Sequence, residues 1–265
     1  MKEQPVASAA RRQSQAILGD MLWPLHKQAL RSVVRKEGAS VIDISCGSGA
    51  SSIGLLALLG ESSRLSAFDP DLVNIDSATS NGRNIVTGAE VNFVHGQFEE
   101  WVFPHKVDCV YGAAILNTLE RNTQIIEKAF DCLIPGGLLL LSFIDFSRMY
   151  GFPRSFALDR YGEYMRSFQE SLGMQISPAR IQSLCEDKRF SQVSLSSSMP
   201  HFLDEKSRKL PSLILEFASH FIVENGHSST VELDAIISEL RQTAEKSGAM
   251  ISEPVIYQLT AVRAQ

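Results

Sequence analysis

Several common functional signals are missing from this sequence of 265 residues. Its four cysteines show neither metal-binding nor redox spacing, so we expect no metal site and a reducing, cytoplasmic location. No apolar run approaches the roughly twenty residues that a membrane-spanning helix needs. The first fourteen residues are small and polar and lack the apolar centre of a secretory signal peptide.

Charge excludes a further class of partner. Lysine and arginine total 25 against 30 aspartates and glutamates, which gives a net charge of −5. The one basic cluster, Arg11-Arg12, is too small for a nucleic-acid footprint, so we expect no nucleic-acid partner. The length allows one full hydrophobic core with or without a cap, and no internal repeat occurs.

What the chain does contain is a glycine turn. A short apolar strand, Val41 to Ile44, precedes Gly47 and Gly49, and an apolar helix from Ala50 to Leu59 is expected directly afterwards. Glycine serves where backbone bends sharply or a ligand comes close, because it has no Cβ. A helix that begins after such a turn presents free N–H groups and a positive dipole. The pattern therefore suits a nucleotide-like cofactor that carries a carboxylate or phosphate.

Two cofactor classes use this strand, turn and helix. A dinucleotide fingerprint places glycine or alanine at the third glycine position, where this chain has Ser52. The strand also ends in Asp43, four positions before Gly47. This acid-x-small-x-Gly-x-Gly run resembles the cofactor loop of class I S-adenosylmethionine-dependent methyltransferases, with Ser45 where the first glycine usually stands. The resemblance implies that Asp43, Ser45 and the two glycines bind the cofactor.

A second carboxylate follows at the expected distance. The strand that begins at Leu65 ends in Asp69-Pro70, twenty residues after Gly49. A carboxylate at the tip of the second strand can accept hydrogen bonds from both hydroxyls of a ribose. The alternative is a turn aspartate, because Asp-Pro-Asp is good turn chemistry by itself. We assign Asp69 and Pro70 to the cofactor site.

Two later loops complete the resemblance, which covers roughly residues 38–146. It implies that Gln97 lies beside the adenine amino group and that Phe98 packs on the ring, although Gln97 could equally be an exposed loop residue. Ala113, in the loop after the fourth strand, joins the cofactor residues. Asn117, in the same loop, is a candidate for the substrate pocket.

The resemblance implies an α/β fold, a Rossmann-like doubly wound sheet of seven strands with the last strand antiparallel. Pro135-Gly136-Gly137 is expected as a turn before a long apolar fifth strand that ends at Ile144. The expected parts are an N-terminal helical arm (1–36), the cofactor-binding core (37–146), a cap loop and helix (147–176), a core helix and strand (177–198), a helical insertion (199–250) and the final core strand (251–265).

The flanking segments supply candidates for substrate binding. The arm has an apolar helical stripe that Pro24 kinks or divides, and Trp23 and His26 are possible pocket residues. The loop after the fifth strand carries Arg148, Tyr150 and Phe152 in a stretch that would otherwise be exposed. We expect this loop and the helices of the cap to form an apolar lid. The alternative is that its aromatic residues only pack the cap onto the sheet. A helix from Ser155 and a capping box at 229–232 are also expected.

The expected activity is S-adenosylmethionine-dependent methyl transfer, by in-line displacement, to a small and partly apolar metabolite. The tail of the chain looks like the ubiquinone/menaquinone methyltransferase group. The partner is the acceptor molecule, and the protein is a monomer or homodimer. No catalytic base is assigned, because the four histidine candidates lie in no diagnostic motif: His26, His105, His201 and His220. Two alternatives stay open: a catalytically silent binding protein of the same fold, and a nucleotide-dependent oxidoreductase, which Ser52 disfavours.

Overall fold

The computed structural model describes residues 5–34, 36–83, 85, 88–114, 118–174, 177–202 and 204–265. The chain divides into two compact units. The larger unit consists of Gly19–Phe143, Ile176–Ser196 and Tyr257–Gln265. The smaller unit consists of Met1–Leu18, Ile144–Gln175 and Ser197–Ile256.

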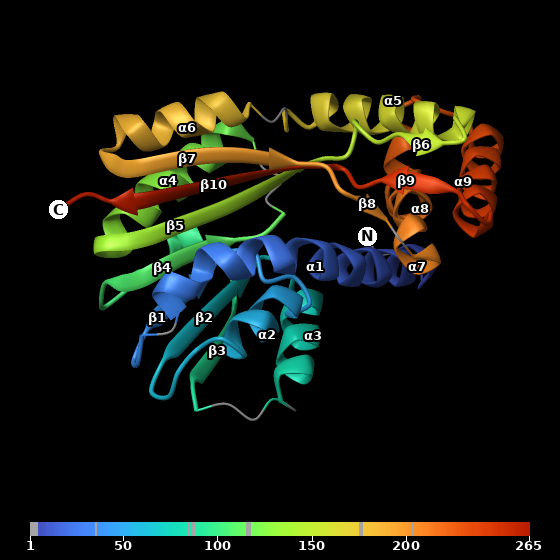
Figure 1. Cartoon of the computed structure of the whole chain (residues 1–265). Helices are drawn as coiled ribbons and strands as arrows, with labels where there is room; N and C mark the ends of the chain where they lie inside the picture. Colours follow the sequence, from blue (N-terminus) through green and yellow to red (C-terminus); the bar gives the residue numbers. More distant parts are fainter. Residues whose placement is uncertain are drawn as a thin grey trace. The chain divides into compact units, whose positions relative to one another are not determined.

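The larger unit is built on a seven-stranded sheet with the order β3-β2-β1-β4-β5-β10-β7. Its strands are β1 (Ser40–Asp43), β2 (Arg64–Asp69), β3 (Glu90–His95), β4 (Val107–Gly112), β5 (Leu133–Asp145), β7 (Phe190–Ser198) and β10 (Val255–Arg263). Strands β1 to β5 pair in parallel, and the last strand, β10, runs antiparallel (Figure 1). The expected sheet of seven strands is therefore confirmed.

Helices cover both faces of this sheet (Figure 1). They are the part of α1 (Pro5–Val34) from Gly19 onward, α2 (Ala50–Leu56), α3 (Leu72–Gly82), α4 (Leu119–Cys132), α6 (Pro178–Asp187) and the short 3-10 helix η1 (Phe98–Glu100). In β1, Val41 belongs to a buried cluster with Leu30 of α1 and Leu55 of α2. Its neighbour Ile42 belongs to the cluster that contains Ile126 of α4 and other residues of α4 and α6. Because successive strand residues face opposite sides, burial on both faces explains the nearly continuous apolar strands. The doubly wound arrangement is confirmed.

The predicted Pro135-Gly136-Gly137 turn takes a different form. Residues 133–145 are one strand, so these three residues lie within β5 and not before it. The pairing shifts from Val107↔Leu133 to Cys109↔Leu138, so five residues of β5 match two of β4. The extra residues form a bulge, which Gly136 accommodates with a φ of +80°.

Two helix boundaries also differ from expectation. The sequence predicts that Pro24 kinks or divides the helical arm; helix α1 continues through Pro24 as one element, so this residue does not divide it. Helix α2 ends at Leu56 and not at Leu59, which leaves it with seven residues.

The smaller unit contains a three-stranded antiparallel sheet and a group of helices. The sheet, in the order β6-β9-β8, consists of β6 (Gly151–Phe152), β9 (Met250–Ser252) and β8 (His201–Phe202). The helices are α5 (Phe156–Ser171), α7 (Glu205–Arg208), α8 (Leu210–Glu224) and α9 (Thr230–Glu245). The helical part of this segment was expected, whereas its short strands were not.

The helices expected from Ser155 and at the capping box 229–232 are present, and one contact of the capping box differs. Ser155 caps α5, and Ser229 caps α9 by accepting a hydrogen bond from the Glu232 N–H (3.2 Å). The Glu232 carboxylate, however, accepts from Arg160 (2.6 Å) and Tyr164 (3.0 Å) of α5. Glu232 therefore ties two helices together and does not complete a capping box.

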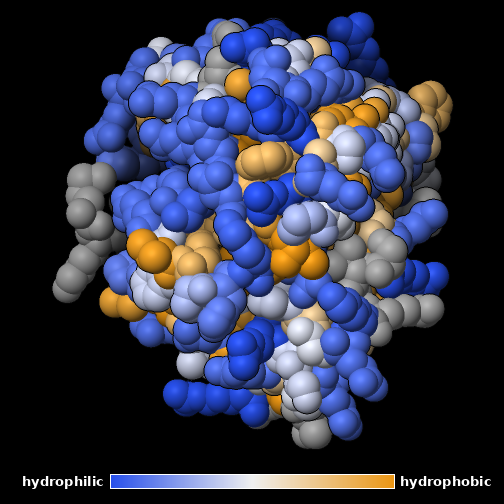
Figure 2. Space-filling view, turned by 90° about the vertical axis from the view of Figure 1, so that its left-hand side faces the viewer, coloured by the Kyte–Doolittle hydropathy of each residue, from blue (hydrophilic) through white to orange (hydrophobic). Residues whose placement is uncertain are grey.

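Among the described residues, no helix is both long and apolar enough to span a membrane. The face of the molecule seen in Figure 2 is mostly hydrophilic, with hydrophobic residues in small separate patches.

Candidate functional site

The glycine turn connects β1 to α2 and needs both of its glycines. Gly47 and Gly49 have φ values of +53° and +92°, which a residue with a Cβ rarely adopts. A Cβ on Gly49 would also lie 3.0 Å from the Ala78 Cα of α3. The Gly49 N–H donates to the Cys46 carbonyl (2.9 Å), which closes the turn.

The Asp43 carboxylate stabilises the turn through hydrogen bonds. The side chain is fully buried, and its carboxylate accepts hydrogen bonds from the Ser45 N–H (3.2 Å) and from the hydroxyls of Ser51 and Ser52 (both 2.8 Å). Burial raises the pKa of Asp43 to about 6, and these hydrogen bonds oppose the shift. Ser52, at the third glycine position, therefore fixes Asp43 against the first turn of α2.

Asp69 holds the turn from the second strand. Its Oδ2 accepts from the Gly47 N–H (3.0 Å), and its Oδ1 accepts from the Asp71 N–H and the Asn74 amide (both 2.9 Å). The side chain is 7% exposed. The next residue, Pro70, is exposed, and its carbonyl lies 3.1 Å from His95 Nε2. Asp69 is therefore both a turn residue and a link between the tips of β1 and β2.

Ser45 and Ala113 connect the turn to the loop after β4. The Ser45 hydroxyl donates to the Ala113 carbonyl (2.9 Å), and the Ala114 N–H donates to the Ser142 hydroxyl (3.1 Å). These bonds connect the turn after β1 to the loop after β4, and that loop to β5. Asn117 lies outside the described residues.

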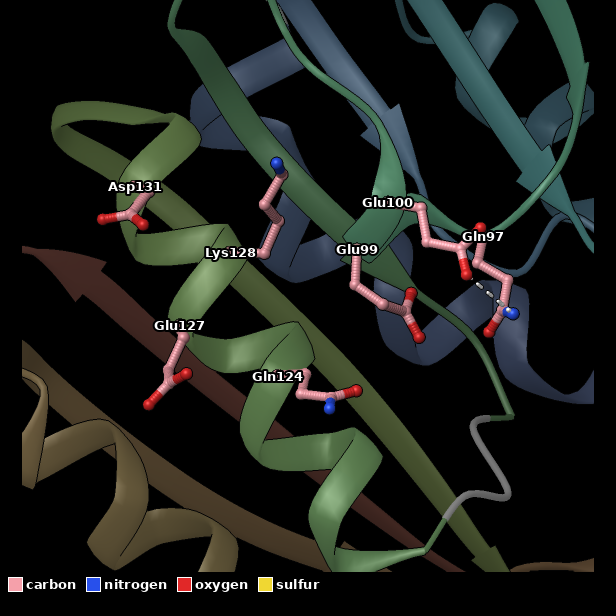
Figure 3. Close-up of a pocket in the computed structure, with 7 residues that line it drawn as sticks. All are labelled: Gln97, Glu99, Glu100, Gln124, Glu127, Lys128 and Asp131. Atoms are coloured by element: carbon pink, nitrogen blue, oxygen red, sulfur yellow. Dashed lines mark hydrogen bonds between the residues drawn. The ribbon is translucent and has the colours of Figure 1, made fainter.

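Gln97 and Phe98 are placed differently from each other. Phe98 is buried in the core, with its ring centroid 6.3 Å from that of Phe68 and 5.6 Å from that of Phe103. The Gln97 amide donates to Glu100 Oε1 (3.3 Å) at the border of a groove of about 560 Å³ between η1 and α4 (Figure 3). The groove is polar and mainly acidic, with the lining residues Gln97, Glu99, Glu100, Gln124, Glu127, Lys128 and Asp131. Such a lining does not provide an apolar surface for an adenine ring.

His26 and Trp23 lie in the part of α1 that belongs to the larger unit. His26 Nδ1 lies 2.6 Å from the Tyr111 hydroxyl, and both side chains are buried. Burial lowers the pKa of His26 to about 4, so the imidazole is neutral near pH 7. Trp23 covers Gly54 of α2, where a Cβ would lie 2.8–2.9 Å from the indole ring. The other ring nitrogen of His26, Nε2, is buried and has no hydrogen-bond partner among the described residues.

Cys46 lies inside the turn but is a poor nucleophile. Burial, followed by the nearby Asp43 and Asp69 carboxylates, raises the pKa of its thiol far above the usual range. Because the thiolate is the reactive form, this thiol is inert at neutral pH.

The other pocket candidates belong to the smaller unit. Arg148 pairs with Asp145 (3.0 Å), and the Tyr150 hydroxyl lies 2.5 Å from His201 Nε2. In the register of the small sheet, Phe152 is opposite Met250, and these side chains are 67% and 38% exposed. The other face of the sheet, which includes Ile251, is buried. Tyr150, Phe152 and Met250 therefore form an apolar face with one phenol–imidazole pair.

Sequence reasoning missed three residues that build or contact the turn, Ser51, Asn74 and Asn81, and it missed Tyr111 as the partner of His26. Asn74 and Asn81 are seven positions apart, which places both on one face of α3, and this spacing was an available signal. Tyr111 gave none, because it reads as an ordinary strand residue.

Comparison with known proteins points to the same segment. Residues 41–137 match a family model described as a methyltransferase domain, and this range contains every cofactor candidate from Asp43 to Ala113. No curated protein matches the sequence.

Solved structures are similar in fold over most of the chain. The cyclopropane synthase MmaA2 from Mycobacterium tuberculosis is 17% identical with a TM-score of 0.57, over 89% of this chain and 81% of its own. The YcgJ protein from Bacillus subtilis is 13% identical with a TM-score of 0.57, over 90% and 97%. Phosphoethanolamine N-methyltransferase 2 from Haemonchus contortus is 11% identical with a TM-score of 0.56, over 92% of this chain but 53% of its own. Residues 41–137 therefore match a methyltransferase domain, and the similar structures show that the fold is of the Rossmann-like methyltransferase kind.

Proposed function

We propose that this protein binds S-adenosylmethionine and transfers the methyl group to a small, partly apolar metabolite. The observation that carries the proposal is the Gly47–Asp69 hydrogen bond, which fixes a glycine turn at the tips of β1 and β2 inside the matched methyltransferase segment. The similar structures of the Haemonchus enzyme and of the mycolic acid cyclopropane synthase CmaA1 contain S-adenosylhomocysteine, which supports the choice of cofactor.

The residues of the turn fit such a cofactor. Gly47 and Gly49 present backbone without side chains, and the Asp69 carboxylate keeps an acceptor position on Oδ2 for a ribose hydroxyl. The Ala113 carbonyl is held by Ser45 at the neighbouring strand end. When bound, S-adenosylmethionine supplies an electrophilic methyl group on a sulfonium. The chain itself holds and aligns the reactants and excludes water, which accounts for much of the rate in such reactions.

Proton removal is not assigned to His26. A neutral imidazole with a pKa near 4 is a weak base at pH 7, and its Nδ1 already faces the Tyr111 hydroxyl. The remaining candidates, His105, His201 and His220, stay predictions. Of these, His201 is paired with Tyr150.

Our proposal for the kind of acceptor rests on the sequence and on exposed residues of the smaller unit. Exposed Tyr150, Phe152 and Met250 favour an acceptor with an apolar part. Together with the tail of the chain, they support a place near the ubiquinone/menaquinone group, with Arg148 as a further pocket residue. The division into arm, core and cap, the lid, the cytoplasmic location and the monomer or homodimer state belong to the same proposal.

Calorimetry tests the cofactor assignment. We expect S-adenosylmethionine and S-adenosylhomocysteine to bind and NAD not to bind. Asp69→Ala should lower the affinity at least about tenfold, since a hydrogen bond to a charged group contributes about 1.5–3 kcal/mol. Asp76→Ala, an exposed carboxylate on α3, is the control and should bind normally. Absence of binding at high micromolar concentration would refute the proposal.

Activity is tested with a labelled methyl group. The protein is incubated with methyl-labelled S-adenosylmethionine and a cell extract, which is then separated into small-molecule, protein and nucleic-acid fractions. We expect the label in the small-molecule fraction. Binding without any transfer would favour the silent binding protein.

A further inference from the structure

Tyr150 and His201 form a hydrogen-bonded pair on the small sheet of the smaller unit. The Tyr150 hydroxyl lies 2.5 Å from His201 Nε2, and the two rings meet edge to face with their centroids 5.5 Å apart. Ser252 of the central strand β9 lies between them, because it bonds to the backbone of Tyr150 on one side and is opposite His201 on the other. The small Ser252 side chain leaves room for the two rings to meet above it.

The sheet does not need this pair to hold its strands together. The Ser252 N–H donates to the Tyr150 carbonyl (2.8 Å), and the Tyr150 N–H donates to the Ser252 hydroxyl (2.9 Å). Residues two apart in a strand share a face, so Phe152 lies on the same face as Tyr150, with Met250 opposite it. All three of these side chains are exposed. Exposed apolar side chains beside one polar pair suit an apolar ligand that carries a single polar group.

Hydrogen-bond accounting indicates which polar group the pair would bind. A neutral imidazole has one donor nitrogen and one acceptor nitrogen, so the bond between the rings can run in either direction. If the Tyr150 hydroxyl donates, its oxygen keeps an acceptor position, and if His201 Nε2 donates, the Tyr150 O–H stays available as a donor. No second hydrogen bond of this hydroxyl occurs among the described residues. A ligand hydroxyl can pair with either state, whereas a carboxylate only accepts and an ammonium only donates.

We propose that Tyr150 and His201 determine acceptor specificity by binding a hydroxyl group, while Phe152 and Met250 contact the apolar part of the same molecule. The acceptor class is then an uncharged, hydroxylated apolar molecule, and acids and amines are disfavoured. This inference rests on the proposed function, because it names the class of acceptor, but the binding site itself lies within the smaller unit.

The test is a nuclear magnetic resonance titration of protein with isotopically labelled methionine methyl groups. The probes are 3-phenylpropanol, 3-phenylpropanoate and 3-phenylpropylamine, which differ only in the polar group. The chain has seven methionines, and the Met250 signal is assigned by its loss in Met250→Leu. We expect the alcohol to shift the Met250 signal and to bind at least about threefold more tightly than the acid or the amine.

Two results of this titration would overturn the inference. One is equal or tighter binding of the acid or the amine, and the other is a Met250 signal that no probe shifts at millimolar concentration. S-adenosylmethionine is absent from the titration, so a protein that does not bind the cofactor would refute the proposed function without changing the result with the probes.

Tyr150→Phe and His201→Phe test the pair directly, because each removes the polar atoms and keeps an aromatic ring. Both variants should still bind the probes, but the preference for the alcohol should fall to within about twofold. His220→Phe is the matched control, because His220 is an exposed histidine on α8 of the same unit that pairs with Glu224 (3.1 Å). It should keep the native preference. An unchanged preference in Tyr150→Phe, with folding checked by circular dichroism, would overturn the role of the pair.

Discussion

Replacing Asp43 with asparagine removes a buried carboxyl group whose pKa burial raises from 3.8 to about 6. Between these two values the native state binds more protons than the unfolded state, so this group makes the free energy of unfolding fall as pH rises. A difference of about 2 pKa units corresponds to about 3 kcal/mol, which is lost between about pH 4 and pH 6. The Asp43→Asn variant lacks this loss.

His26 acts in the opposite direction, because burial lowers its pKa from 6.5 to about 4. The unfolded state binds more protons in that range, so this group makes the free energy of unfolding rise with pH. In the native protein the two effects offset each other. His26 is present in both proteins, so its effect cancels in their comparison. We therefore expect the free energy of unfolding of Asp43→Asn, minus that of the native protein, to rise by about 3 kcal/mol from pH 4 to pH 7.

Urea unfolding followed by circular dichroism at pH 4, 5, 6 and 7 measures this difference. Asp76→Asn, an exposed carboxylate on α3, serves as the control and should give a constant difference. If the Asp43→Asn difference were also constant within about 0.5 kcal/mol, burial would not control this carboxyl group and the reasoning would be refuted.

Two further predictions concern packing and exposure. Gly54→Ala should lower the free energy of unfolding by about 1–3 kcal/mol, because the new Cβ would overlap the Trp23 ring. In the control variant Gly60→Ala, the new Cβ meets no atom closer than 3.8 Å, so the free energy of unfolding should change little. Urea unfolding of both variants tests this prediction. The Tyr150 and Phe152 side chains are 44% and 67% exposed, so Tyr150→Ala and Phe152→Ala should change the melting temperature by only a few degrees. Both variants should reduce turnover of the acceptor more than they reduce binding of the cofactor. A large loss of stability with normal turnover per folded molecule would contradict the pocket assignment.

The parts of the fold that the sequence predicted are those with a local signal. The short apolar run Val41–Ile44 predicts a buried strand, and the two glycines predict a tight turn, because both signals depend only on neighbouring residues. Pro135-Gly136-Gly137 had the composition of a turn, yet pairing with β4 drew it into a strand as a bulge. Strands of two or three residues, such as Gly151–Phe152, are too short for any period to be visible.

The contacts that define the site were harder to predict. The Tyr111 hydroxyl and His26 are 85 positions apart in the sequence, and only the packing of α1 brings them together. No sequence pattern identifies the hydroxyls of Ser51 and Ser52 as hydrogen-bond partners of Asp43. Asp69 was predicted as a ligand residue, but its bonds to Gly47 and Asn74 depend on how α3 packs, which a strand-end motif does not specify.

The contact between Trp23 and Gly54 makes the first turns of α2 optically observable. The chain has only two tryptophans, and Trp23 is the half-buried one, whereas Trp101 is 43% exposed. Emission from an indole shifts with the polarity around it, and this indole covers the helix that follows the glycine turn directly. A Trp101→Phe protein would carry a single emitter at that helix. Any rearrangement of the turn on ligand addition could then be followed as a spectral change in real time, without a label.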